Sequence, residues 1–288
     1  LSFIEIWRPF PIDIEHKEIN TPRKTEIIAI FIIRDEILLL SLLDFNLLYM
    51  KKGRFKIDTL IKNTLLFVLF SLMIPSLQAQ EIIPGAERIS LYINKLIDKK
   101  VAVIANNTSI IKNGDQSVHL IDTLINRGVK IKKIFSPEHG FLGDKDDGEK
   151  IEDGQYKSIE VISLYGKKRK ISNEDIEDID IIVFDIQDVG VRFYTYLSTL
   201  HYAMEASSRT NKKIIILDRP NPNSFYIDGP VLETENSSFI GLHPVPIVYG
   251  MTIGEYGRMI NGEGWLENKI KADLEVISIK HYNHNLKY

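Results

Sequence analysis

The sequence predicts an α/β fold built around a mostly parallel sheet. Five short runs are rich in Ile and Val, which is typical of strands buried on both faces: 101–104, 131–135, 181–184, 214–217 and 276–279. Helical patterns lie between these runs, at 117–126, 173–178, 197–209 and 252–261. Strands that alternate with helices through short connections form right-handed crossovers, which place the strands parallel in one sheet.

Helix 117–126 has the clearest periodicity, because its apolar residues share one face and Gly128 follows as a stop signal. The segment 225–246 is rich in Gly, Pro, Asn and Ser, and we predict it to be the longest loop. The acidic run 144–149 does not fit the spacing of an EF-hand, so we interpret it as a solvated loop and predict no metal site.

The composition is that of a globular protein and excludes several function classes. The chain has 288 residues, of which 44% are hydrophobic, and its 36 Lys and Arg against 39 Asp and Glu give a net charge of −3. Without a basic excess, nucleic acid is not the expected partner. The absence of Cys excludes thiolate nucleophiles, Cys-ligated zinc and iron–sulfur clusters. No GxGxxG, P-loop or GxSxG motif occurs, and we predict no cofactor.

The segment 50–79 has the three parts of a secretory signal peptide. Basic residues at 51–56 precede the apolar run 65–74, and the small residue Ala79 marks the expected cleavage site. The apolar run is much shorter than the roughly 20 residues that span a bilayer. We therefore expect export to the periplasm or the extracellular medium, with no membrane anchor after cleavage.

Residues 1–49 are expected to be a non-native extension upstream of a start at Met50. The alternative is a further membrane-proximal helix over 27–49, but four charged residues interrupt that apolar stretch: Arg34, Asp35, Glu36 and Asp44. The working domain is then expected to comprise residues 80–288.

Polar side chains follow four of the predicted strands at their carboxyl ends. They are Asn106 and Asn107; Glu138 and His139; Asp185, Gln187 and Asp188; and Asp218, Arg219 and Asn221. In open α/β sheets, ligands bind in the crevice outside these strand ends. We therefore expect these side chains to converge on one pocket.

Several of these residues allow two interpretations. Glu138 could act as a general acid or base, or could belong to a capping loop. Asp188 could be functional or could cap the segment that follows it. Asp218 and Arg219 could form an internal ion pair, or Arg219 could hold a substrate carboxylate.

An aromatic segment follows Gly190 and begins with Arg192. The rings of Tyr194 and Tyr196 have apolar faces and hydroxyl tips, which suit sugar rings, although buried tyrosines are also common in protein cores.

Six motifs in this order resemble the NamZ-type exo-β-N-acetylmuramidases of glycoside hydrolase family 171. They are SPEHG at 136–140, SLYG at 163–166, VFDIQDVGVRFYTY at 183–196, LDRPNP at 217–222, DGP at 228–230 and YGMTIGE at 249–255. The resemblance implies a Rossmann-like three-layer domain. It also implies release of N-acetylmuramic acid from the non-reducing ends of peptidoglycan fragments, in cell-wall turnover and recycling.

The resemblance makes Glu138 the first choice as catalytic acid or base. For the second group, Asp185 or Asp188 is preferred over Glu149, Glu205 and Asp218. Carboxylates about 5 Å apart would indicate retention of configuration and those about 6.5–9.5 Å apart inversion. Assistance by the substrate's N-acetyl group is a third route.

The predicted residues fall into two groups. The catalytic candidates are Glu138, His139, Asp185 and Asp188. The candidates for binding muramyl saccharides are Asn106, Asn107, Gln187, Arg192, Tyr194, Tyr196, Asp218, Arg219 and Asn221, with Arg192 or Arg219 expected to recognise the lactyl carboxylate.

Members of the family continue into a second domain with PSPN and EGTN segments, which do not occur here. We therefore expect this sequence to be a fragment, incomplete at its C-terminus, that could fold and still be inactive. The alternative function is a non-catalytic module that binds peptidoglycan fragments. An esterase or amidase is disfavoured because the motifs supply no set of nucleophile, base and orienting group.

Overall fold

The computed structural model describes residues 81–114, 116–142 and 153–286, together with Lys62. The predicted extension 1–49 lies outside the described residues, and so does the predicted signal peptide 50–79 apart from Lys62. Contacts divide the chain into two units, Leu1–Gln78 and Ala79–Tyr288, and the sheet belongs to the second. Among the residues that the structure describes, no helix is both long enough and apolar enough to cross a membrane.

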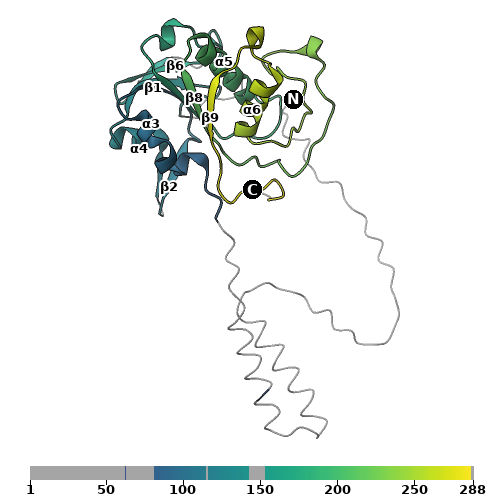
Figure 1. Ribbon diagram of the computed structural model, residues 1–288, viewed down its shortest axis with the longest axis horizontal. Helices are drawn as coiled ribbons and strands as arrows, with labels where there is room; N and C mark the ends of the chain where they lie inside the picture. Colours follow the sequence, from purple (N-terminus) through teal and green to yellow (C-terminus); the bar gives the residue numbers. More distant parts are fainter. Residues whose placement is uncertain (1–61, 63–80, 115, 143–152, 287–288) are drawn as a thin grey trace, which may run out of the picture. The chain divides into compact units, whose positions relative to one another are not determined.

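A seven-stranded sheet forms the centre of the second unit, in the order β5-β6-β4-β1-β7-β8-β9 (Figure 1). Its strands are β1 Lys100–Ala105, β4 Lys130–Ser136, β5 Gly154–Tyr156, β6 Ile159–Ser163, β7 Ile181–Asp185, β8 Lys213–Leu217 and β9 Asp273–Ile277. Neighbours from β6 to β9 pair in parallel, and β5 pairs antiparallel with β6 at the edge. The predicted α/β fold with a mostly parallel sheet is confirmed.

Helices cover both faces of this sheet and make it the middle of three layers. Alternate residues of β1 point to opposite faces: Val101 and Val103 pack in one apolar cluster, and Ala102 and Ile104 pack in the other. The first cluster includes residues of α3 Ile93–Leu96 and α4 Leu120–Asn126. The second includes residues of α5 Tyr196–Arg209 and α6 Ile253–Glu263, which lie side by side in Figure 1.

The remaining elements are short. A separate hairpin pairs β2 Ile110–Asn113 with β3 Gln116–His119. Single 3₁₀ turns occur at η2 Gly85–Glu87, η3 Ile89–Leu91, η4 Glu174–Ile176, η5 Thr234–Asn236 and η6 Glu267–Lys269.

Several predicted elements differ from the structure. Helix 117–126 begins only at Leu120, because 117–119 pair as β3 and the His119 side chain accepts a hydrogen bond from the Ile121 amide at the helix start. The predicted helix 173–178 is the single turn η4. The last strand is Asp273–Ile277, not 276–279. It ends at Ile277 because its partner β8 ends at Leu217, which pairs with Ile277. Strands β2, β3, β5 and β6 were not predicted.

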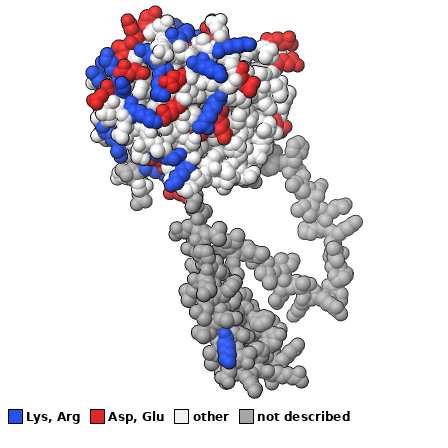
Figure 2. Space-filling model, viewed as in Figure 1, with Lys and Arg blue, Asp and Glu red and all other residues white. Residues whose placement is uncertain are grey.

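Basic and acidic side chains are interspersed on the face shown in Figure 2. On neighbouring strands they form ion pairs such as Lys213 with Asp273, at 3.0 Å. Ion pairs at such exposed positions contribute about 0–1 kcal/mol each, so apolar burial holds the three layers together.

The direction of the strand order reverses at β1. From β1 the chain continues to β4 on one side, and it returns after β6 to form β7 on the other side. This is the arrangement in which a crevice opens outside the carboxyl ends of the strands. The loops after β1, β4, β7 and β8 begin at that edge, and they carry the predicted site residues.

Candidate active site

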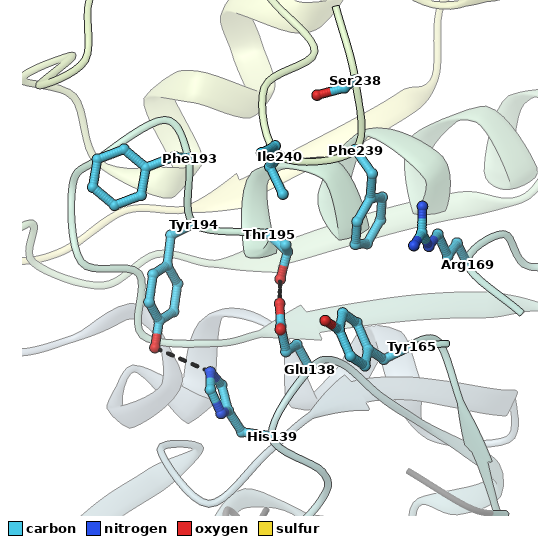
Figure 3. Close-up of a pocket in the computed structure, with 10 residues that line it drawn as sticks. All are labelled: Glu138, His139, Tyr165, Arg169, Phe193, Tyr194, Thr195, Ser238, Phe239 and Ile240. Atoms are coloured by element: carbon cyan, nitrogen blue, oxygen red, sulfur yellow. Dashed lines mark hydrogen bonds between the residues drawn. The ribbon is translucent and has the colours of Figure 1, made fainter. Parts of the chain in front are cut away.

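A cavity of about 470 Å³ opens beside the loop after β4 and the start of α5 (Figure 3). Four segments that are far apart in the sequence line it: Glu138 and His139 after β4; Tyr165 and Arg169 after β6; Phe193, Tyr194 and Thr195 before α5; and Ser238, Phe239 and Ile240 in the loop 225–246. We call it the Glu138 cavity. Of the predicted site residues, Glu138, His139 and Tyr194 line it.

The carboxylate of Glu138 is oriented by one hydrogen bond. Thr195 Oγ1 donates to Glu138 Oε2 at 2.6 Å, as the dashed line in Figure 3 shows. Thr195 immediately precedes α5, and its side chain makes no capping bond to that helix, so its hydroxyl proton is directed to the carboxylate. Thr195 is buried and Glu138 is half-buried, so one oxygen of Glu138 is fixed while its side chain stays accessible from the cavity.

His139 adopts a backbone conformation that is unusual for its residue type. Its φ is 70°, in the left-handed region, and Gly140 follows at 80°. The Gly140 amide donates to the Pro137 carbonyl at 3.2 Å, which closes the turn. The imidazole Nε2 lies 3.4 Å from the Tyr194 hydroxyl, and the two rings are stacked. The turn therefore directs Glu138 and His139 to the same cavity.

Aromatic side chains form the wall opposite His139. The ring of Phe239 stacks on Tyr202 with centroids 6.2 Å apart, and Tyr165 lies tilted against it at 6.4 Å. Phe193 and Ile240 are exposed at the rim. Apolar faces combined with hydroxyl and carboxylate groups suit sugar rings, which have apolar faces and polar edges.

Asp185 and Arg219 form a buried ion pair, and Arg219 lines a second cavity of about 350 Å³ together with Gln187. Arg219 Nε donates to Asp185 Oδ1 at 2.6 Å and Nη2 donates to Oδ2 at 2.9 Å, while Nη2 also reaches the Ile110 carbonyl at 3.1 Å. Asp185 is 0% exposed. The predicted ion pair between Asp218 and Arg219 was therefore wrong, because the guanidinium engages Asp185. The contact uses the Nε and Nη2 edge of the guanidinium, and Arg219 does not line the Glu138 cavity.

Asp218 holds the start of α6 and lies outside the cavity. Its Oδ1 accepts from the Gly254 amide at 2.8 Å, and its Oδ2 accepts from Thr252 Oγ1 at 2.9 Å. Burial raises the pKa of Asp218 to about 6. Its contacts are those of a side chain that anchors a helix N-terminus.

Asp188 is buried beside Tyr249. Its Oδ2 accepts hydrogen bonds from the Tyr249 hydroxyl and, at 2.8 Å, from the Gly190 amide, which is the capping contact considered from the sequence. Its Oδ1 has no hydrogen-bond partner in the described part of the chain. Burial raises the pKa of Asp188 to about 6, and the hydrogen bonds from Tyr249 and Gly190 offset only part of that rise.

Asp188→Asn is expected to become more stable relative to the wild type as the pH rises. The pKa of Asp188 rises from 3.8 to about 6, so between these values the folded state binds more protons than the unfolded state and wild-type stability falls with increasing pH. The variant does not have this pH-dependent cost. Its free energy of unfolding should therefore rise by about 2–3 kcal/mol relative to that of the wild type between pH 4 and pH 7. Urea unfolding across this range measures it, with the exposed Asp178→Asn as control. Parallel pH profiles for Asp188→Asn and wild type would contradict the prediction.

Gln187 and Asn221 bind backbone rather than the cavity. Gln187 Nε2 donates to the Pro220 carbonyl at 2.6 Å, and Asn221 Nδ2 donates to the Met251 carbonyl at 2.7 Å. Gly190 has a φ of 82°, and a Cβ there would lie 2.0 Å from Asn221 Oδ1, so this close approach requires glycine. The Gln187 bond and the approach of Gly190 to Asn221 fasten the loops after β7 and β8 to each other, and the Asn221 bond ties the second loop to the segment before α6.

Arg192 fastens the long loop. Its Nη1 donates to the carbonyls of Pro230 and Val245, both at 2.6 Å. The predicted role of Arg192 in recognising a carboxylate is therefore not supported, because the structure directs its guanidinium to backbone carbonyls outside the cavity lining.

Asn106 and Tyr196 lie beneath the cavity, and Asn107 does not join them. Asn106 Nδ2 donates to the Tyr196 hydroxyl at 3.0 Å, and both side chains are buried. Tyr196 packs edge-on against Tyr194, with centroids 4.9 Å apart. Asn107 is exposed in the turn after β1. Tyr196 thus supports Tyr194, which itself lines the cavity.

The other carboxylates considered from the sequence do not complete a pair with Glu138. Glu205 is buried in α5, where its Oε1 lies 3.1 Å from His201 Nε2, and Glu149 lies outside the described residues. Among the carboxylates that the structure describes, Glu138 alone lines the cavity.

Sequence reasoning missed seven residues that line the cavity: Tyr165, Arg169, Phe193, Thr195, Ser238, Phe239 and Ile240. Tyr165, Phe193 and Thr195 lie within motifs that carry the resemblance, and Ser238, Phe239 and Ile240 lie in the predicted long loop. No sequence feature indicated Arg169 as a site residue, because strand β6, which precedes its loop, was not predicted.

The fold and the site place the chain among α/β proteins with a ligand cavity at the carboxyl ends of a parallel sheet. Within this class the chain belongs to the family described as exo-beta-N-acetylmuramidase NamZ, N-terminal, whose model matches residues 101–288. The resemblance inferred from the six motifs is thereby confirmed.

One relative is the peptidoglycan beta-N-acetylmuramidase NamZ of Bacillus subtilis (strain 168). It is 40% identical over 202 residues, which cover 68% of this chain and 47% of the relative. The chain therefore spans about half the length of this relative.

Two crystal structures of DUF1343 family proteins from Bacteroides fragilis are also similar to the chain. The first has a TM-score of 0.63 and 40% identity, covering 73% of this chain and 55% of the other. The second has a TM-score of 0.63 and 37% identity, covering 72% and 52%. Both support the α/β assignment.

Proposed function

We propose that the protein is an exo-acting glycosidase that releases N-acetylmuramic acid from the non-reducing ends of peptidoglycan fragments. The observation that carries the proposal is Glu138, a carboxylate oriented by Thr195 in an aromatic-lined cavity. Membership of the NamZ family and the name of the Bacillus subtilis relative support the same reaction.

In the proposed reaction Glu138 protonates the glycosidic oxygen as the bond to the leaving sugar breaks. The carboxylates of Asp185, Asp188 and Asp218 do not line the Glu138 cavity. A substrate-assisted route, in which the N-acetyl oxygen attacks the anomeric carbon, requires no carboxylate nucleophile from the protein and is consistent with a cavity that Glu138 alone of the described carboxylates lines. Glu138 then accepts a proton from the water that opens the intermediate.

The test is release of N-acetylmuramic acid from a synthetic muramyl-glucosamine disaccharide by the complete protein. The proposal expects the free sugar to appear in step with glucosamine, and no cleavage of ester or peptide bonds in matched fragments. Binding of the disaccharide without turnover would replace the glycosidase with a peptidoglycan-binding module.

We further propose that the protein is exported to the periplasm or the extracellular medium. The pattern of 50–79 supports this, since basic, apolar and small residues follow in the order of a signal peptide. Mass spectrometry of the protein from fractionated cells should find an N-terminus at Gln80. Recovery of the uncleaved chain in the cytoplasm would contradict the proposal.

A further inference from the structure

We propose that Arg169 selects sugars that carry a carboxylate, and that Phe239 holds its guanidinium in position for this. The inference rests on the proposed function and names the residue that would set its substrate specificity. Its ligand is the lactyl carboxylate that distinguishes a muramyl sugar from a glucosaminyl sugar.

Charge in the Glu138 cavity is sparse. Of the described residues that line it, Arg169 alone carries a permanent positive charge. A guanidinium binds a carboxylate through two parallel N–H bonds. A phosphate would place more negative charge beside Glu138 with a single cation to balance it, so one carboxylate is the better match.

The guanidinium is held by an aromatic face and leaves its edge available. The central carbon of the Arg169 guanidinium lies 4.6 Å from the centre of the Phe239 ring. In Figure 3 it flanks this ring at the end of the cavity, beyond Tyr165. Because the Phe239 ring packs against the flat face of the guanidinium, it orients this group without using the N–H donors, which lie in the plane of the guanidinium. Within the described part of the chain, no carboxylate lies within ion-pair distance of Arg169.

Phe239 is itself fixed by α5. Ser198 Oγ donates to the Phe239 carbonyl at 2.5 Å, and the ring stacks on Tyr202 with an angle of 10° between the planes. The same helix begins next to Thr195, which orients Glu138. One rigid element therefore positions both the reacting carboxylate and the platform under Arg169.

The two arginines predicted from the sequence are engaged elsewhere. Arg192 donates to two backbone carbonyls, and Arg219 forms the bidentate pair with Asp185. Arg169 is exposed and lines the cavity, so a carboxylate can reach it without breaking a buried contact.

The experiment compares two disaccharides with the complete protein: muramyl-glucosamine, and the same compound with its lactyl carboxylate converted to an amide. Arg169→Gln should lower kcat/KM for the acid about ten- to hundredfold, mainly through KM, and change that for the amide less than threefold. Arg169→Lys, which keeps the charge but loses the fork, should fall between. Lys167→Gln removes an exposed charge from the same loop outside the cavity, and should leave both substrates unchanged.

An equal loss on both substrates, or an unchanged preference for the acid, would overturn the role of Arg169 while leaving the proposed function intact. Failure of the wild type to cleave either disaccharide would count against the proposed function. Calorimetric binding of N-acetylmuramic acid and its amide then decides the inference: loss of the preference in Arg169→Gln supports it, and a retained preference overturns it.

Discussion

Glu138→Gln is expected to lower kcat for the muramyl disaccharide about 10²–10⁴-fold, the usual contribution of a general acid or base. Glutamine keeps the shape of the side chain and can still accept the Thr195 hydrogen bond, but it cannot deliver a proton to the leaving oxygen. Steady-state rates of N-acetylmuramic acid release measure the effect, and unchanged thermal unfolding confirms that the fold is intact.

The leaving group supplies the control for this prediction. In a nitrophenyl muramide the leaving group is nitrophenolate, which departs without protonation. Glu138→Gln should therefore lose much less activity on this substrate than on the disaccharide. Thr195→Val removes only the orienting hydrogen bond and should cost less than Glu138→Gln on the disaccharide. Full activity of Glu138→Gln on the disaccharide would exclude Glu138 as the acid.

Arg219→Met is expected to lower the free energy of unfolding by about 3–5 kcal/mol, because it leaves Asp185 buried and unpaired. Asp185 is 0% exposed and Arg219 is 6% exposed, so water cannot replace the lost partner. Urea denaturation near pH 7 measures the change. A loss below about 1 kcal/mol would contradict the assignment of a buried ion pair.

The matched control removes both charges. The double variant Asp185→Leu with Arg219→Met leaves no unpaired ion, so it should be less destabilised than the sum of the single variants. Strict additivity would mean that the two side chains do not interact in the folded protein.

The central strands were predictable because their burial appears in the sequence. In β7 every residue is buried, and an unbroken apolar run is the direct result. Strand β6 was missed because Glu160 and Ser163 interrupt its apolar residues, which is possible near the sheet edge, where Glu160 is exposed. Residues 117–119 were assigned to a helix because pairing with β2 cannot be read from local periodicity.

The location of the site could be predicted from the sequence, but only some of the residues that line it could. Glu138, Asp188 and Asp218 all follow the carboxyl end of a parallel strand, where ligands are expected to bind. Glu138 lines a cavity, whereas Asp188 and Asp218 are buried. Their partners, Tyr249 and Gly254, lie in a distant part of the chain. A rule based on strand ends cannot distinguish a carboxylate that serves the fold from one that faces substrate.

The turn at His139 places strain on the backbone. A left-handed conformation costs a side-chain-bearing residue about 1–2 kcal/mol, a cost that glycine does not carry. Substitution by glycine would relieve this backbone strain and remove the imidazole that packs against Tyr194. The left-handed turn at His139 is therefore a strained backbone conformation that holds an imidazole at the edge of the Glu138 cavity.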